Sequence, residues 1–193
     1  MHRKPLLELL LRYERRHPEE AACVTRMRAL VASRTDCFER TALPGHVTGS
    51  AFVLSSDCRS TLLVHHRKFD RWLQPGGHAD GETDPARIAL REAQEETGLA
   101  DLRFFGADGE RAEPVPFDLD VHGIPARPGE PAHEHHDVRF LLVASPGASA
   151  RASDESFAVR WFPLADLESE GVDESLLRMA GKTRALLASA AED

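Results

Sequence analysis

The sequence has few cysteines and no long apolar run, and each shortage excludes a class of protein. Its three cysteines, Cys23, Cys37 and Cys58, are scattered and follow no metal-ligand spacing, which favours reduced thiols over a disulfide framework. No apolar run approaches the roughly 18 residues needed to cross a bilayer, and residues 1–20 contain no small-residue cleavage site. We therefore expect a cytoplasmic protein without a membrane partner.

Positive charge is also in deficit. The formal net charge is −8, which argues against nucleic acid as the main partner because tracking a phosphate backbone requires a basic face. Residues 76–100 alone carry a balance of −4, half of the total. Their six acids are Asp80, Glu82, Asp84, Glu92, Glu95 and Glu96. Such a local concentration is typical of a cation site.

The pattern along the chain predicts an α/β protein. Helical spacing of apolar residues covers 5–17, 18–33 and 173–189, and β-rich segments occur at 46–55, 61–69, 102–107, 115–126, 136–145 and 157–167. Strands on both sides of a central helix predict a layered α/β/α sandwich with a mixed sheet. We expect an N-terminal helical extension over 1–40 and one main domain over 41–193 that includes the C-terminal helix. The terminal helices are candidates for a homodimer interface.

The central helix is predicted over 85–97. Asp84 and Pro85 suit its N-cap and first turn, and Gly98 suits its C-terminal stop. On this helix Glu92, Glu95 and Glu96 occupy one arc beside the apolar stripe. Like charges at this spacing destabilise a helix, so a bound cation would offset the repulsion, and carboxylate oxygens favour Mg²⁺, with Mn²⁺ as a substitute. The alternative is a solvated acidic face with Arg91 reaching along the helix.

The segment GGHADGETDPARIALREAQEETGL, residues 76–99, resembles the Nudix box. Arg91, Glu92, Glu95, Glu96, Gly98 and Leu99 match that pattern position by position, with Ala93 in the aliphatic position. The resemblance covers roughly 46–167. It implies the Nudix sandwich fold and hydrolysis of the diphosphate bond in a nucleoside diphosphate linked to another moiety X. It also implies Mg²⁺ held by Glu92, Glu95 and Glu96.

The loop before the helix departs from the pattern by one residue. Counted from Gly77 the first Glu position is Thr83, and counted from Gly76 it is Glu82, but Arg91 then arrives one residue late. We expect Gly76 and Gly77 to form a tight turn before the helix. The two glycines are equally compatible with a turn that belongs to a functional site and with an ordinary structural turn. Together with His78 and Glu82 they are candidate substrate-binding residues. Arg91 is expected to orient a neighbouring carboxylate.

Histidines form a second unusual group, because eight of the ten lie between residues 46 and 136. Period two would place His133, His135 and Asp137 on one side of an extended segment, and likewise Asp118, Asp120 and His122. If the two segments pair as a hairpin, these polar sides can meet. His133 or His135 is then a candidate for a substrate-phosphate contact, a second metal contact or a general base, with surface histidines in the loop 127–135 as the alternative.

Two other functions compete with hydrolysis. His46 and His78 are similar in place to metal-binding histidines of isopentenyl diphosphate isomerase, but the cysteine expected two residues before the second histidine is Gly76. A non-catalytic nucleotide sensor on the same fold would not need the complete set of Glu92, Glu95 and Glu96. The presence of all three therefore argues against a sensor. The sequence specifies neither the moiety X nor the nucleobase of the substrate.

Overall fold

The computed structural model describes residues 2–106 and 114–190. The helices are α1 (Lys4–Arg16), α2 (Ala21–Ser33), α3 (Pro85–Thr97) and α4 (Glu174–Ala190), with short 3-10 turns η1 (Pro18–Glu20) and η2 (Leu167–Glu170). The strands are β1 (Gly45–Leu54), β2 (Ser60–His66), β3 (Arg71–Leu73), β4 (Gly76–His78), β5 (Leu102–Phe104), β6 (Asp118–Ile124), β7 (His133–Ala144) and β8 (Ser156–Pro163).

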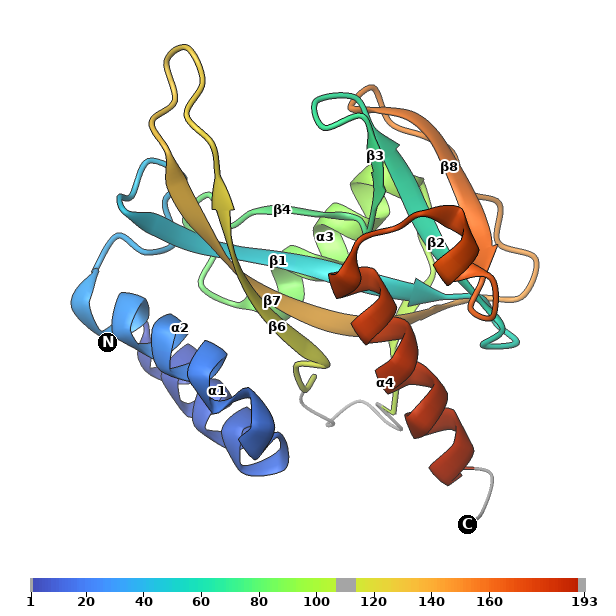
Figure 1. Ribbon diagram of the computed structural model, residues 1–193, viewed down its shortest axis with the longest axis horizontal. Helices are drawn as coiled ribbons and strands as arrows, with labels where there is room; N and C mark the ends of the chain where they lie inside the picture. The colour runs from blue at the N-terminus through green and yellow to red at the C-terminus, as the bar shows by residue number, and fades with distance from the viewer. Residues whose placement is uncertain (1, 107–113, 191–193) are drawn as a thin grey trace.

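Two long strands, β1 and β7, form the centre of the sheet. They pair in parallel from Gly45 opposite Glu134 to Leu54 opposite Val143, and every residue of β1 is buried. The other described pairings are antiparallel. β4 pairs with the middle of β1 and β2 with its end, so β2 diverges with β3 and β8 into a separate arm (Figure 1). The sheet is therefore mixed, as predicted.

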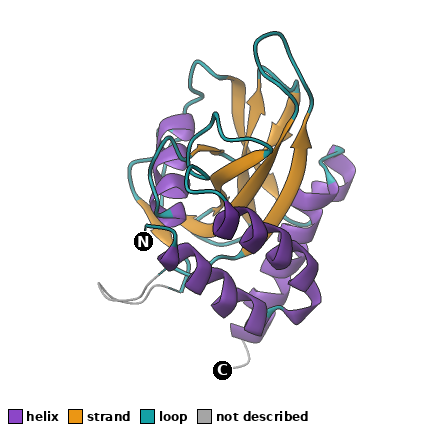
Figure 2. Cartoon of the chain, turned by 90° about the vertical axis from the view of Figure 1, so that its left-hand side faces the viewer, coloured by secondary structure: helices purple, strands orange, loops and turns teal. Residues whose placement is uncertain are grey.

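Helices cover both faces of this sheet (Figures 1 and 2). α3 packs so closely on β1 that a Cβ at Gly49 would lie 2.9 Å from Cβ of Ile88. On the opposite face, Leu176 and Met179 of α4 share a buried cluster with Phe52 of β1. Alternating side chains of one strand thus serve two separate cores. The predicted α/β/α sandwich is confirmed.

The N-terminal helices pack into the same core as the central strands. Leu6, Leu10 and Met27 belong to one buried cluster with Val47 and Val138. This cluster continues from the N-terminal helices into the central strands and marks no division between them. The domain boundary expected between residues 40 and 41 therefore stays a prediction. Among the described residues, no helix combines the length and apolar character needed to cross a membrane.

Local sequence signals explain α3. The Asp84 carboxylate accepts a hydrogen bond of 3.0 Å from the backbone N–H of Ala86, and Pro85 occupies the first helical position. Gly98 ends the helix in the left-handed region at φ 68°. The predicted helix over 85–97 is confirmed residue for residue.

Two local predictions are wrong. Gly76 and Gly77 form no tight turn but lie in β4, because absence of a side chain allows close approach to β1 and α3. A Cβ at Gly76 would lie 2.3 Å from Cβ of Ser50. The second correction concerns His133 and His135, which belong to β7 and not to a loop, because β6 provides the paired strand that local sequence does not reveal.

Candidate metal and catalytic site

The site is built around the carboxylate of Glu96 on α3. Its side chain is directed into the protein, and the residue is only 5% exposed. The backbone N–H of Gly76 in β4 donates a 3.0 Å hydrogen bond to Oε2 of Glu96. Burial raises the pKa of Glu96 to about 8; the negative charges of Glu92 and Glu155 add to that increase, and the Gly76 hydrogen bond opposes it.

Glu92 lies beside the glycine pair. A Cβ at Gly77 would lie 2.3 Å from Oε2 of Glu92, so this carboxylate can occupy its place only because residue 77 has no side chain. Burial raises the pKa of Glu92, while the adjacent Arg91 charge lowers it. The carboxylates of Glu92 and Glu96 on α3 are therefore partly or wholly removed from solvent.

Arg91 connects the helix to β4. Its Nη1 lies 2.5 Å from Oε1 of Glu92 and 3.5 Å from Oε2 of Glu95, and its Nη2 donates a 2.9 Å hydrogen bond to the carbonyl oxygen of His78. The guanidinium thus contacts both carboxylates while anchored to the strand. The Glu95 side chain is 62% exposed, in contrast to that of Glu92 at 14%. The contact expected of Arg91 with neighbouring carboxylates is present.

Sequence reasoning missed two further residues of this site. Ligand atoms of His66 and Glu155 lie with one of Glu96 inside a group whose members are all within 4.8 Å. The chain reaches this position because Arg151 N donates to the Thr97 carbonyl at 2.7 Å, at the C-terminal end of α3. No local sequence pattern identifies Glu155 as a site residue, because its position beside Glu96 depends on tertiary contacts of the segment before β8.

The donor set fits a hard divalent cation. Glu92 and Glu96 provide carboxylate oxygens, and His66 and the exposed Glu155 lie at the rim beside Glu96; burial first, and then repulsion from Glu92 and Glu155, raises the pKa of Glu96. A bound cation would relieve that repulsion and favour the ionised form. Oxygen ligands of this kind suit Mg²⁺ or Mn²⁺.

Glu82 has a local structural environment. Its Oε1 accepts hydrogen bonds from the backbone N–H groups of Thr83 at 2.8 Å and Asp84 at 3.1 Å, and its Oε2 lies 3.5 Å from Arg87. These contacts stabilise the approach to α3. A substrate-binding role for Glu82 stays a prediction.

The predicted meeting of the two polar segments is confirmed. β6 and β7 pair antiparallel with His122 opposite His135 and Asp120 opposite Asp137. The ring of His135 also lies 5.2 Å, centroid to centroid, from each of the rings of His78 and His133. Desolvation lowers the pKa of His135 to about 2 and that of His78 to about 4, and nearby positive groups contribute in both cases. Both imidazoles are therefore neutral near pH 7.

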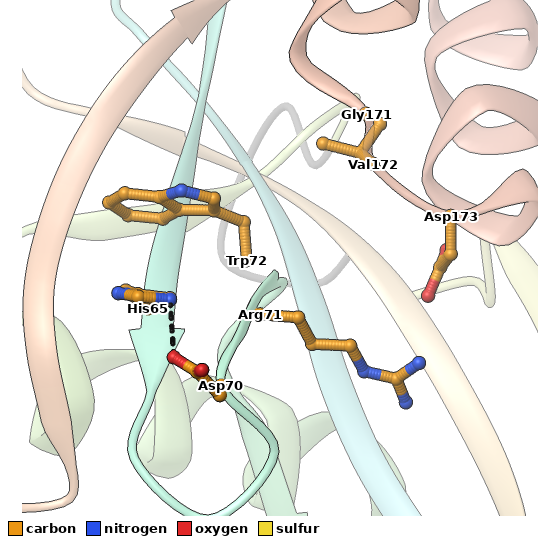
Figure 3. A pocket seen from close by; sticks show the side chains of 7 residues that line it. All are labelled: His65, Asp70, Arg71, Trp72, Gly171, Val172 and Asp173. Atoms are coloured by element: carbon orange, nitrogen blue, oxygen red, sulfur yellow. Dashed lines mark ion pairs between the residues drawn. The ribbon is translucent and has the colours of Figure 1, made fainter.

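A separate pocket of ≈ 340 Å³ lies between β3 and the segment that precedes α4 (Figure 3). Its lining consists of His65, Asp70, Arg71, Trp72, Gly171, Val172 and Asp173. Within it, Nε2 of His65 lies 3.3 Å from Oδ1 of Asp70, and the His65 and Trp72 rings stack with centroids 5.0 Å apart. None of the α3 glutamates lines this pocket, so it is distinct from the carboxylate site.

Comparison with known proteins identifies the family. The family model for the NUDIX domain matches residues 45–180. A Nudix-family hydrolase from Clostridium perfringens is 25% identical, with a TM-score of 0.59 over 74% of this chain and 97% of that one. The Ap4A hydrolase of C. elegans is 17% identical, with a TM-score of 0.57 over 74% and 98%. The NUDIX domain of Shewanella oneidensis NrtR, solved with ADP ribose, is 16% identical, with a TM-score of 0.52 over 73% and 87%. Curated protein sequences give no match.

The matched domain and the carboxylate site on α3 together define a pyrophosphohydrolase. The chain belongs to the Nudix family, whose members hydrolyse pyrophosphate bonds in nucleoside diphosphate derivatives and generally use a divalent metal ion. Its partner is accordingly a small molecule.

Proposed function

We propose that this protein hydrolyses, in a Mg²⁺-dependent reaction, the diphosphate bond of a nucleoside diphosphate linked to a moiety X. The observation that carries the proposal is the buried Glu96 carboxylate, held by the Gly76 N–H and surrounded by Glu92 and Glu155. Such an arrangement is unfavourable without a cation, because burial and repulsion both oppose ionisation.

Glu92 and Glu96 would hold the metal directly, with Glu95 at the exposed edge of the same site. A Mg²⁺ ion held by these carboxylates would supply charge that neutralises phosphate oxygens and would lower the pKa of an attacking water. Arg91 is a positioning residue, because it contacts Glu92 and Glu95 while bonded to the His78 carbonyl. Fixing both carboxylates before substrate arrives reduces the reorganisation required in the transition state.

Glu155 is our candidate for the group that accepts a proton from the attacking water. It is exposed and belongs to a different segment from α3, yet a carboxylate oxygen of Glu155 lies within 4.8 Å of a ligand atom of Glu96. A base at the rim of a metal site can reach a metal-activated water without occupying the position of a buried ligand. The proposal therefore assigns metal binding to the glutamates of α3 and proton transfer to Glu155, which lies in the segment before β8.

The substrate is to be found by a phosphate-release screen with a phosphatase-coupled readout, run first with Mg²⁺ and then with Mn²⁺. The panel contains nucleotide sugars, dinucleoside polyphosphates, nucleoside triphosphates, ADP-ribose, NADH and CDP-alcohols. Ap4A and ADP-ribose merit priority because two structurally similar proteins are an Ap4A hydrolase and a NUDIX domain solved with ADP ribose. Glu96→Gln is the inactive variant, and Glu168→Gln, an exposed glutamate on η2, is the matched control.

A metal-dependent product that disappears in Glu96→Gln and persists in Glu168→Gln supports the proposal and identifies X. Nucleotide binding without turnover would instead support a sensor, and rearrangement without phosphorylated products would support an isomerase. A homodimer through the terminal helices remains part of the proposal, to be tested by light scattering.

A further inference from the structure

Four adjacent strands carry histidines in one row. β1 pairs with β4 on one edge and with β7 on the other, and β6 lies beyond β7; Figure 1 shows these strands side by side. His46 is directly opposite His135, which is directly opposite His122. On β4, His78 is opposite Thr48, two residues along β1 from His46 and hence on the same face. The row is therefore a consequence of strand register.

His46 is the least satisfied member of this row. It is 1% exposed, and neither Nδ1 nor Nε2 makes a hydrogen bond of good geometry with a described residue, although a contact with the Ala42 backbone opposes the lowering of its pKa by burial. An unpaired buried polar group costs free energy, so native proteins normally provide it with a partner. The rings around it are those of His78, His133 and His135, with centroids 5.2, 5.0 and 4.9 Å from that of His46. Its nearest ring neighbours are thus three other imidazoles.

His133 has the arrangement of a metal ligand supported by an outer hydrogen bond. Its Nδ1 lies 2.9 Å from the carbonyl oxygen of Pro131, which can only accept, so Nδ1 carries the proton and the lone pair of Nε2 accepts a hydrogen bond from Nε2 of His135. That Nε2 lies 3.3 Å from Nε2 of His135. Two nitrogens on a tetrahedral ion with Zn–N of about 2.0–2.1 Å are separated by about 3.4 Å, which matches this spacing. A carbonyl behind a ligating imidazole is the usual means of fixing its tautomer.

We propose that His46, His78 and His135 bind a transition-metal ion of the Zn²⁺ class, with His133 as the adjacent fourth imidazole. Ligand nitrogens of the first three already lie within 4.8 Å of one another, so rotations of the side chains suffice to close the shell. Imidazole donors select Zn²⁺ and similar ions, whereas the carboxylates of α3 select Mg²⁺. The protein would then contain two metal sites of different chemistry, connected through β4.

One contact must change when the ion binds. Nη2 of Arg40 lies 2.7 Å from Nδ1 of His78, and Nε of Arg40 lies 2.9 Å from Oδ1 of Asp80. An arginine only donates, so Nδ1 of His78 is the acceptor in this arrangement. If His78 binds the ion through Nε2, its Nδ1 carries the proton and can no longer accept from Arg40, so Arg40 must leave the ring. Arg40 can then keep its ion pair with the exposed Asp80.

The proposal is tested by metal binding alone, independently of any substrate. Full-length protein is freed of metal, titrated with Zn²⁺ by calorimetry, and titrated separately with Co²⁺ while its visible absorption is recorded. We expect one Zn²⁺ per chain and a Co²⁺ spectrum of low-coordinate, nitrogen-rich type. His135→Asn and His78→Asn should each lower Zn²⁺ affinity by at least ~10–100-fold and change that spectrum.

Two controls separate this site from the carboxylate site. His2→Asn removes an exposed histidine outside the row, and Glu96→Gln changes the α3 site; both should leave Zn²⁺ binding intact. His78 and His135 are only partly buried, so their variants are preferred to one at His46, and circular dichroism verifies that they fold. Absence of Zn²⁺ binding, or binding unchanged in both histidine variants, would overturn the proposal. Neither result bears on Mg²⁺-dependent hydrolysis, which the substrate screen measures separately.

Discussion

The backbone N–H of Gly76 donates a hydrogen bond to the buried carboxylate of Glu96 at 3.0 Å. The bond joins a short strand, which pairs with the middle of β1, to the last turn of α3. It holds Oε2 of Glu96 beside the glycine pair, while His66 and Glu155 approach the same carboxylate from other segments. The position of the carboxylate is therefore a property of the α3–β4 interface.

Replacing Glu96 should cost more activity than replacing Glu95. Glu96→Gln retains an oxygen that can accept from Gly76, so the fold should persist while kcat/KM with Mg²⁺ falls by at least ~100-fold. Glu95→Gln should cause a smaller decrease, because the Glu95 side chain is 62% exposed. Initial rates over a Mg²⁺ titration give both values. Equal activity of Glu96→Gln and wild type, at every Mg²⁺ concentration, would remove the carboxylate site from the mechanism.

Gly77→Ala should reduce activity with little loss of stability. Its Cβ would lie 2.3 Å from Oε2 of Glu92, at the movable end of a flexible side chain. Glu92 would rotate away, separating it from Arg91 and from the site. We expect a decrease of ~10-fold or more in kcat/KM with the thermal midpoint nearly unchanged. Gly123→Ala is the matched control, because a Cβ at Gly123 meets no heavy atom within 4 Å among the described residues.

Gly76→Ala, in contrast, should lower the stability of the fold. Its Cβ would lie 2.3 Å from Cβ and 2.8 Å from Cα of Ser50, so the backbone of β4 must separate from β1. Overpacking of this kind typically costs about 1–3 kcal/mol. Urea denaturation of Gly76→Ala and Gly77→Ala in parallel tests the contrast, and a loss of stability confined to Gly77→Ala would contradict it.

The parts of this structure that follow from local sequence were predictable, and the parts that depend on distant contacts were not. Asp84, Pro85 and Gly98 specify the ends of α3 through their own backbone and side-chain chemistry, and period two would place His133 and His135 on one side if the segment is extended, but that they lie in a strand depends on pairing with β6. By contrast, the approach of Glu155 to Glu96 requires the connection before β8 to pack on the end of α3. The glycines of β4 were read as a turn because their partner strand lies more than 20 residues away.

Asp118 should contribute substantially to stability. This fully buried carboxylate on β6 accepts hydrogen bonds from Arg139 at 3.2 Å, Arg178 at 2.8 Å and Lys182 at 2.6 Å. Removing the Asp118 charge takes one counterion from the buried Arg139, which keeps only Asp120 and Asp137, and breaking a buried ion pair costs about 3–5 kcal/mol. Asp118→Asn should therefore lower the free energy of unfolding by that amount. Asp101→Asn, at an exposed aspartate, is the control, and equal denaturation midpoints for both variants would contradict the prediction.

The same cluster should make the protein sensitive to acid through Asp120. Burial acts to raise the pKa of Asp120, but hydrogen bonding to His122 and the positive charges of Arg139 and Arg178 outweigh it and lower the pKa from 3.8 to about 2. A pKa that is lower in the folded than in the unfolded state means that the unfolded chain binds the proton first. The stabilisation is therefore complete above pH ~4 and is lost as pH falls toward 2.

Urea midpoints measured from pH 6 to pH 2 test this dependence. Wild type should lose stability steeply below pH ~4, and Asp120→Asn should lose less over the same interval because it has no proton to take up at that position. Asp101→Asn should retain the steep wild-type profile. Parallel acid profiles for wild type and Asp120→Asn would show that Asp120 ionisation does not stabilise the fold, and would place the acid sensitivity on Asp118, whose pKa is also lowered by Arg178, Arg139 and Lys182 against the opposing effect of burial.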